Sequence, residues 1–233
     1  ADWHERHKLM KVSFDTGVQT DEAANQIQFG HVMRPTHRSR AFDADRFEVC
    51  NHGFTALYDA THGAAVLNNG KYGVSMEGSV ISLSLLRGAT HPDPAADQGA
   101  HEYRYAYFVW RGAFETSGVV YEAAALNAPV WKAEGAVGRE AMLEISDPAC
   151  VLETVKLAED GGGDMILRLY ESMNGARCVS VRVPENTAAA WRCGLDETKN
   201  EMLKIERGSV QIAMHPFEIV TLRVEKSMRE ERI

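Results

Sequence analysis

The chain has 233 residues, 45% of them hydrophobic and 25% charged, a composition that fits folded domains and argues against a disordered chain. Its 33 acidic residues outnumber 25 Lys and Arg for a net charge of −8, which disfavours a nucleic-acid partner because phosphate binding needs a concentrated positive field. No segment approaches the ~20 apolar residues that span a bilayer, and the charged N-terminus has no apolar signal region, so we expect no membrane partner.

Short β-favouring runs separated by turn signals fill the first half of the chain, and this pattern predicts a sandwich or barrel. The runs are 8–14, 25–29, 47–51, 64–67, 80–85, 103–109 and 119–126. The apolar Ile81 and Leu83 flank Ser82, and this alternation predicts a strand with one buried face and one small, polar face.

A second group of runs follows the stretch 129–138, which carries one Pro and two Gly and which we interpret as a linker between domains. These runs are 142–145, 151–158, 165–171, 178–183, 189–195 and 217–224. Six or seven strands in about 95 residues match a small sandwich of immunoglobulin size. We therefore predict an all-β protein with a first domain over 1–128, the linker, a smaller sandwich over 139–226 and a charged tail, 227–233, without function.

The four cysteines, Cys50, Cys150, Cys178 and Cys193, form no C-x-x-C pair, and each lies in a strand-like run. This spacing argues against zinc and against a disulfide framework. Free cysteines are commonly buried, so we interpret all four as reduced core thiols of a cytoplasmic protein.

Histidines are frequent near the N-terminus, where His4, Glu5 and His7 lie close together. On a strand, His4 and His7 face opposite sides, and H-E-R-H lacks the spacing of the helical H-E-x-x-H zinc motif. We expect ordinary hydrogen-bonded histidines here and no metal site.

A polar loop, HPDPAADQGAH, holds His91, Asp93, Asp97 and His101. Its two prolines and its glycine favour a rigid loop over a helix. The loop could border a binding site or hold calcium, although two aspartates supply too few oxygen ligands. A structural loop is the favoured interpretation.

The segment LNNGKYG, residues 67–73, gathers amide, ammonium and phenol groups in Asn68, Asn69, Lys71 and Tyr72. Amides bridge vicinal hydroxyls and an aromatic ring packs on the apolar face of a pyranose, so the segment has the chemistry of a sugar site. The alternative is a plain β-hairpin, because Asn-Gly is a strong signal for a type I′ turn. Spacing alone favours the hairpin.

No motif in the chain assembles a hydrolytic centre, since G-x-S-x-G, the P-loop and G-x-G-x-x-G are all missing. Acidic residues are numerous, but no pair stands out as the two carboxylates of a glycosidase. We therefore expect no catalytic residues in this chain.

Several segments, in order along the chain, resemble the C-terminal half of family 38 glycoside hydrolases, the α-mannosidases, and the cytosolic and bacterial type in particular. They are DWHERHKLMKVSF (2–14), QFGHVMRPTHRS (28–39), RFEVCNH (46–52), LNNGKYG (67–73), LSLLRGATHPDPAADQGAHEYRYA (83–106), ETVKLAEDGGGDMILRLYES (153–172) and PFEIVTLRVE (216–225). They are distributed from residue 2 to residue 225, along nearly the whole chain, and their order makes chance a poor explanation.

The resemblance implies a β-supersandwich over 1–128, truncated at its N-terminus, and the smaller β-sandwich over 139–226. It also implies a parent enzyme that hydrolyses α-mannosides with retention, in mannose and oligosaccharide catabolism, with an Asp nucleophile and a zinc or cobalt ion in a missing N-terminal domain. By the same resemblance, the LNNGKYG loop reaches the substrate through Asn68, Asn69, Lys71 and Tyr72, and no histidine of this chain matches a metal ligand of the family. Where the family commonly has Asp, this chain has Asn69, which removes a charged acceptor for sugar hydroxyls.

Three functions remain open. The first is the C-terminal fragment of an α-mannosidase, inactive alone, whose partners are an α-mannoside or oligosaccharide and the missing N-terminal domain. The second is a free-standing carbohydrate-binding sandwich module without catalysis. The third is an interaction domain that forms homo-oligomers.

Overall fold

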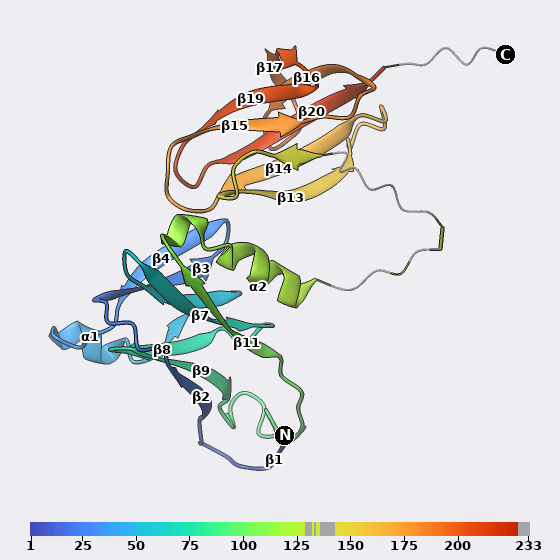
Figure 1. The fold of residues 1–233 in the computed structure, drawn as a ribbon. Helices are drawn as coiled ribbons and strands as arrows, with labels where there is room; N and C mark the ends of the chain where they lie inside the picture. Colours follow the sequence, from blue (N-terminus) through green and yellow to red (C-terminus); the bar gives the residue numbers. More distant parts are fainter. Residues whose placement is uncertain (129–131, 133, 136–142, 228–233) are drawn as a thin grey trace. The chain divides into compact units, whose positions relative to one another are not determined.

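The computed structural model describes residues 1–128, 132, 134–135 and 143–227, and the chain divides into two compact units, Ala1–Trp131 and Lys132–Ile233 (Figure 1). Most of the predicted linker, 129–138, and all but the first residue of the predicted tail, 227–233, lie outside the described residues. Both units consist mainly of strands, which confirms the all-β fold. No helix in the described ranges is long and apolar enough to cross a membrane.

The first unit contains two main antiparallel sheets and a two-stranded ribbon. Its strands are β1 (Asp2–Trp3), β2 (Met10–Asp15), β3 (Glu22–Ile27), β4 (Gly30–Pro35), β5 (Val49–Cys50), β6 (Phe54–Tyr58), β7 (His62–Asn68), β8 (Gly73–Glu77), β9 (Val80–Leu86), β10 (Gly99–Ala100) and β11 (Tyr105–Arg111). The five-stranded sheet has the order β11-β7-β6-β3-β4 and the four-stranded sheet the order β2-β9-β8-β5, while β1 pairs with β10.

Apolar side chains from the two main sheets meet in one core. Leu57 and Val66 of the five-stranded sheet belong to the same buried cluster as Ile81 and Leu83 of the four-stranded sheet. Ile81 and Leu83 are buried and Ser82 between them is half-buried, which confirms the predicted alternation. Burying a side chain of this size stabilises the fold by ~1.5–3 kcal/mol, so the shared core joins the two sheets into a sandwich.

The helix α2 (Val119–Asn127) replaces the strand that was predicted over 119–126. Adjacent valines favour a strand, but the Glu and three Ala that follow them favour a helix, and the helix prevails here. The buried Val119, Val120 and Ala123 fall on one face at helical spacing, and α2 packs on β6, β7 and β11. A short helix, α1 (Ala41–Asp45), and a 3-10 turn, η1 (Phe114–Thr116), complete the helical content of the described residues.

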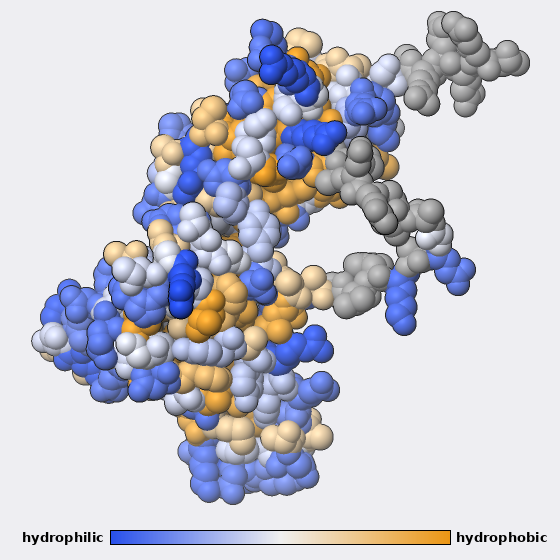
Figure 2. Space-filling view, viewed as in Figure 1, coloured by the Kyte–Doolittle hydropathy of each residue, from blue (hydrophilic) through white to orange (hydrophobic). Residues whose placement is uncertain are grey.

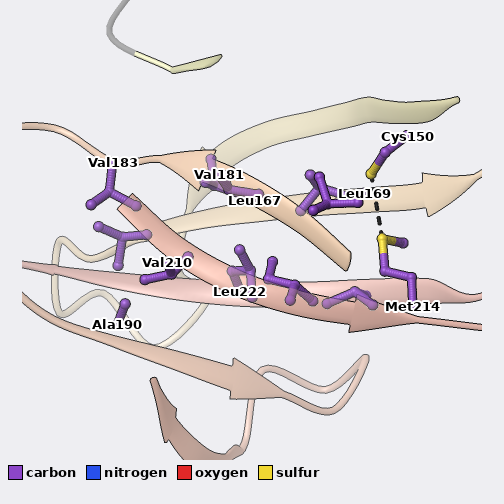
Figure 3. Close-up of a cluster of buried hydrophobic side chains, with 13 residues drawn as sticks. Cys150, Leu167, Leu169, Val181, Val183, Ala190, Val210, Met214 and Leu222 are labelled. Atoms are coloured by element: carbon purple, nitrogen blue, oxygen red, sulfur yellow. Dashed lines mark hydrogen bonds between the residues drawn. The ribbon is translucent and has the colours of Figure 1, made fainter. Parts of the chain in front are cut away.

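The second unit is a sandwich of nine strands within the described residues, more than the six or seven predicted. They are β12 (Glu144–Ile145), β13 (Cys150–Leu157), β14 (Met165–Glu171), β15 (Arg177–Arg182), β16 (Thr187–Cys193), β17 (Lys199–Leu203), β18 (Ile205–Glu206), β19 (Ser209–Met214) and β20 (Ile219–Lys226). The sheets have the orders β12-β15-β19-β18 and β13-β14-β20-β16-β17. Leu167 and Leu222 of one sheet and Val181 and Val210 of the other belong to the core between them (Figure 3).

All four cysteines are free, as predicted, but only two of them lie in the core. Cys150 and Cys193 are buried, whereas Cys50 and Cys178 are exposed, which corrects the prediction of four core thiols. The Cys150 Sγ lies 3.4 Å from the Met214 Sδ (Figure 3), and burial raises the pKa of Cys150 to about 12. Successive side chains of a strand point to opposite faces, so a cysteine in a strand is buried only when its own face is covered.

Candidate functional site

The segment 69–72 connects two different sheets and does not form a hairpin. It follows β7, which pairs with β6 and β11, and it precedes β8, which pairs with β5 and β9. Gly70 has a φ of +95°, in the left-handed region that favours glycine. The hairpin interpretation of Asn-Gly is therefore wrong, because the turn carries the chain from one layer of the sandwich to the other.

Asn68, the last residue of β7, is fully buried and uses its whole amide to hold this loop. Its Oδ1 accepts hydrogen bonds from the backbone N–H groups of Gly70 (3.0 Å) and Lys71 (2.8 Å). Its Nδ2 donates to the His52 carbonyl at 2.7 Å and lies 3.2 Å from the Asn51 Oδ1. Both the oxygen and the nitrogen of the amide are thus engaged, so Asn68 fixes the loop from the inside.

Asn68 is part of a buried chain of polar side chains that we call the amide network: Asn25, Asn51, Thr55 and Asn68, all fully buried. The Thr55 hydroxyl lies 2.7 Å from the Asn51 amide and 3.0 Å from the Asn25 Oδ1. On the side of α2, the Asn127 Nδ2 donates to the Asn68 carbonyl at 3.0 Å. The loop is thus tied through its neighbours to β3, β6, β7 and α2.

Asn69 is exposed and joins the loop to the segment that precedes β11. Its backbone N–H donates to the Arg104 carbonyl at 3.1 Å, and the Arg104 N–H donates to the Asn69 Oδ1 at 3.0 Å. This reciprocal pair holds the Asn69 side chain by its oxygen. An amide held by its oxygen can present its Nδ2 to a ligand.

Lys71 and Tyr72 carry the side chains that the loop directs toward aromatic neighbours. The Lys71 Nζ lies 5.0 Å from the centroid of the Tyr103 ring, within cation–π range. Tyr72 is 56% exposed, and its ring lies 5.4 Å from the His52 imidazole. The Tyr72 carbonyl accepts a hydrogen bond from the Asn51 N–H at 2.8 Å, so the backbone beneath these side chains is fixed as well.

The polar loop that holds His91, Asp93, Asp97 and His101 is fastened to the end of β9. The Asp97 Oδ2 accepts from the Arg87 N–H at 3.0 Å and from the Gly88 N–H at 2.9 Å, and these donors hold the pKa of Asp97 below its ordinary value. The His101 Nε2 lies 2.9 Å from the Asp97 carbonyl, and its ring lies parallel to the Tyr103 ring at 6.2 Å.

The structure therefore brings together two loops that the sequence presents as separate features. We call Lys71, Tyr72, Asp97, His101 and Tyr103 the loop surface. The Tyr103 hydroxyl is buried without a hydrogen-bond partner in the described part of the chain, and burial, with Asp97 nearby, raises its pKa. The sequence did not identify Tyr103 as a site residue, because it begins the run 103–109 that we predicted as a strand. In the structure, the pairing of Asn69 with Arg104 places Tyr103 beside Lys71.

The loop surface offers donors, acceptors and aromatic rings but no hydrolytic pair. Asp97 is its one carboxylate, and the nearby Asp93 uses its Oδ1 to accept from the Ala95 N–H at 2.8 Å. A glycosidase holds two carboxylates at a defined separation across the bond that it cleaves. Among the residues that the structure describes, no group of three His, Cys, Asp or Glu could hold a metal ion. The loop surface is suited to binding a polar ligand rather than cleaving one.

The histidines near the N-terminus make ordinary contacts with separate partners. The His4 Nε2 lies 3.0 Å from the Asp2 Oδ1, and the His7 Nε2 lies 3.1 Å from the Thr90 Oγ1. The two imidazoles therefore do not converge on a common point.

Two protein families match this chain in order along the sequence. The family described as "Glycosyl hydrolases family 38 C-terminal domain" matches residues 1–95. The family described as "Glycosyl hydrolases family 38 C-terminal beta sandwich domain" matches residues 149–222, within the second unit.

Longer proteins align with almost the whole chain. "Alpha-mannosidase 2C1" of Homo sapiens is 37% identical over 228 residues, which cover 94% of this chain and 22% of the human protein. "Alpha-mannosidase G" of Dictyostelium discoideum is 35% identical, with 96% of this chain and 21% of that protein covered. The chain thus spans about a fifth of the length of the relatives that it matches.

Among solved structures, "The crystal structure of an alpha-mannosidase from Enterococcus faecalis V583" is similar with a TM-score of 0.71 and 18% sequence identity. The match covers 93% of this chain and 26% of that one. At this identity the likeness shows a shared fold.

Proposed function

The chain belongs to the C-terminal β region of glycosyl hydrolase family 38, and we propose that it forms the scaffold and one wall of the sugar site of an α-mannosidase. In this proposal, the parent protein hydrolyses α-mannosides with retention, in the catabolism of mannose and oligosaccharides. The chain supplies shape and contacts, and it is inactive by itself.

The catalytic groups would come from the N-terminal domain that the longer relatives contain. The resemblance to the family implies a divalent metal, but the described residues do not fit one, because no three of their His, Cys, Asp or Glu side chains form a group that could hold an ion. We therefore assign the zinc or cobalt ion and the Asp nucleophile to residues outside this chain.

One observation carries the proposal: Lys71 and the exposed ring of Tyr72 stand on a backbone that the buried amide network holds in place. A rigid aromatic ring can pack on the apolar face of a mannose ring, and an ammonium group can donate to its hydroxyls. Preorganisation matters because a loop that is already fixed loses little conformational entropy when a ligand binds.

The four proposed contact residues would then divide into two roles. Asn69, Lys71 and Tyr72 would touch the sugar, whereas Asn68 would position the loop, because its amide is buried and fully hydrogen-bonded. We also propose a cytoplasmic protein, and the four free cysteines, two of them exposed, support a reducing compartment.

An NMR titration of the chain with methyl α-mannoside tests directly whether the loop surface contacts the sugar. We expect weak, saturable shifts confined to the loop surface and its neighbours. Tyr72→Ala should abolish them, whereas Tyr121→Ala, which removes another exposed tyrosine of the same unit, should not. Shifts that are absent, or that persist in Tyr72→Ala, would contradict the proposal.

An activity assay distinguishes a chain that forms only part of the sugar site from a complete enzyme. The chain, supplied with zinc or cobalt and a chromogenic α-mannoside, should show no turnover above buffer. In the complete parent protein, Tyr72→Ala should raise KM by about tenfold, the effect of losing ~1.4 kcal/mol of binding. A free-standing binding module predicts instead that the isolated chain binds as tightly as the complete protein.

A further inference from the structure

A small pocket in the first unit has three arginines among its eleven lining residues. Its volume is about 150 Å³, and its polar lining consists of Arg34, His37, Arg38, Asp43 and Arg46, which we call the arginine pocket. The side chains come from β4, from the segment that joins it to α1, from α1 and from the residue after α1. Phe47, Val49 and Met76 add apolar walls.

The pocket concentrates positive charge on a chain that is negative as a whole. Three arginines against one carboxylate give its lining a net charge of +2 with neutral histidine, whereas the chain carries −8. In Figure 2 the surface around α1, at the left of the view, is mostly hydrophilic. Clustered guanidinium groups favour phosphate because each can donate two parallel hydrogen bonds to its oxygens.

The arginines are held in place by other contacts and keep donors available. The Arg34 Nη2 donates to the Cys50 carbonyl at 3.3 Å, while the Arg34 Nε is buried and has no partner among the described residues. Arg46 lies over the Phe42 ring at 5.1 Å, and the Arg38 Nη2 lies 3.4 Å from the exposed Glu77 carboxylate.

Asp43 adds an acceptor that the protein leaves unused. Its side chain is only 1% exposed, and its Oδ2 accepts from the Arg40 backbone N–H at 3.0 Å and from the Arg40 Nε at 3.2 Å. Its Oδ1 is buried with no hydrogen-bond partner in the ranges that the structure describes. A buried acceptor is costly to leave unpaired, so this oxygen points to a donor supplied from outside the chain.

We propose that the arginine pocket binds the phosphate monoester of a small polyol, of which a hexose phosphate is the representative. The phosphate lies against Arg34, Arg38 and Arg46, and a neighbouring hydroxyl donates to the Asp43 Oδ1. The pocket has room for a phosphate group and several water molecules, so the distal part of a hexose extends outside it. Neither an anion alone nor an uncharged sugar meets both the donor and the acceptor sets.

Calorimetric titration of the chain at constant ionic strength tests this assignment with three probes: glucose 6-phosphate, inorganic phosphate and glucose. We expect the sugar phosphate to bind about tenfold more tightly than inorganic phosphate, the increment that one hydrogen bond to a carboxylate supplies. Glucose should not bind measurably. Equal affinity for the two phosphates would show an anion site only, and binding of none of the three would overturn the proposal.

Two variants locate the binding. Arg46→Ala, at an exposed position, should weaken the binding of both phosphates about tenfold. Arg111→Ala, which removes the same charge from the exposed last residue of β11, should leave their binding unchanged. Asp43→Asn should erase the preference for the sugar phosphate without weakening inorganic phosphate, because the amide keeps the size and loses the charged acceptor. Equal losses in Arg46→Ala and Arg111→Ala would show general charge attraction and contradict the pocket. Thermal unfolding of each variant checks that the unit remains folded.

Discussion

The two units bury polar groups of different kinds. In the first unit the buried polar side chains are mostly neutral amides and hydroxyls, and Asp43 is the one buried acid among its described residues. The second unit buries Glu171, Glu197 and Arg223. Neutral amides hold a loop in place at any moderate pH. Buried charges hold strands in register only while both partners remain charged. The first unit is therefore organised around loops that can meet ligands, and the second around ion pairs that hold it together.

Glu171 is the clearest test of the ionic unit. Its Oε1 accepts from the Met173 N–H and from the Arg177 Nε, both at 2.9 Å, and its Oε2 accepts from the Phe217 N–H at 3.0 Å. Glu171→Ala leaves Arg177 with Asp147, at 3.1 Å, as its carboxylate partner, and it leaves the Met173 and Phe217 N–H groups unpaired. We expect a loss of ~3–5 kcal/mol from the second unit, the usual cost of removing one partner of a buried ion pair. Hydrogen exchange read residue by residue should show the loss in 143–227 and none in the first unit.

One control variant sharpens this result. Glu153→Ala removes an exposed carboxylate of β13 and should change stability by less than ~0.5 kcal/mol. Loss of protection in both units of Glu171→Ala would show that the two do not unfold independently.

Acid should weaken the second unit through the same carboxylate. Burial raises the pKa of Glu171, but the Phe217 N–H, the Arg177 guanidinium and further N–H donors outweigh it and leave the pKa below the ordinary value of 4.5. A lowered carboxyl pKa contributes stability that is present above about pH 4.5 and is lost as pH falls through the folded-state pKa. The second unit of the wild type should therefore lose protection below pH 4.5, and Glu171→Gln should flatten that loss. An unchanged acid profile in Glu171→Gln would assign the loss to other carboxylates.

The amide network of the first unit should give a smaller effect. Asn68→Ala leaves the Gly70 and Lys71 N–H groups and the His52 carbonyl without their partner. Each is a neutral group close to the surface, so we expect a loss of ~1–3 kcal/mol from the first unit. Urea unfolding measures it, and weakened sugar-induced shifts in the loop surface should accompany it. Asn69→Ala, which removes one exposed hydrogen bond, is the matched control and should cost less than half as much.

The strands that sequence predicts well are those in which one physical signal dominates. The apolar run 165–171 coincides with β14 (Met165–Glu171), and the alternation at Ile81 and Leu83 coincides with β9. The prediction fails where two signals compete. Two valines predicted a strand at 119–126, but the alanines that follow them favour a helix, and α2 forms there. The strand β17 (Lys199–Leu203) was not predicted, because its charged residues leave no apolar pattern to recognise.

The candidate site shows a similar division. The sugar-binding chemistry of Lys71 and Tyr72 can be predicted from the sequence, because it depends only on the identity of each residue. The burial of Asn68 and the proximity of Lys71 to Tyr103 cannot be predicted from the sequence, because both depend on which strands pair. The Asn-Gly turn misled for the same reason, since its dipeptide specifies a local bend but not the sheet that the next strand joins.

The smallest expected effect comes from placing at position 69 the Asp that the resemblance to family 38 leads us to expect there. Asn69→Asp keeps the oxygen that accepts from the Arg104 N–H and adds a negative charge at an exposed position near Lys71, so stability should change by less than ~0.5 kcal/mol. The carboxylate offers sugar hydroxyls a charged acceptor in place of an amide, and we expect methyl α-mannoside to bind a few-fold more tightly in the NMR titration. Asn69→Ser, which is neutral and shorter, should bind no more tightly than the wild type. If Asn69→Asp leaves sugar affinity unchanged while Tyr72→Ala abolishes it, then position 69 serves only to join the loop to Arg104, and the sugar wall reduces to Lys71 and Tyr72.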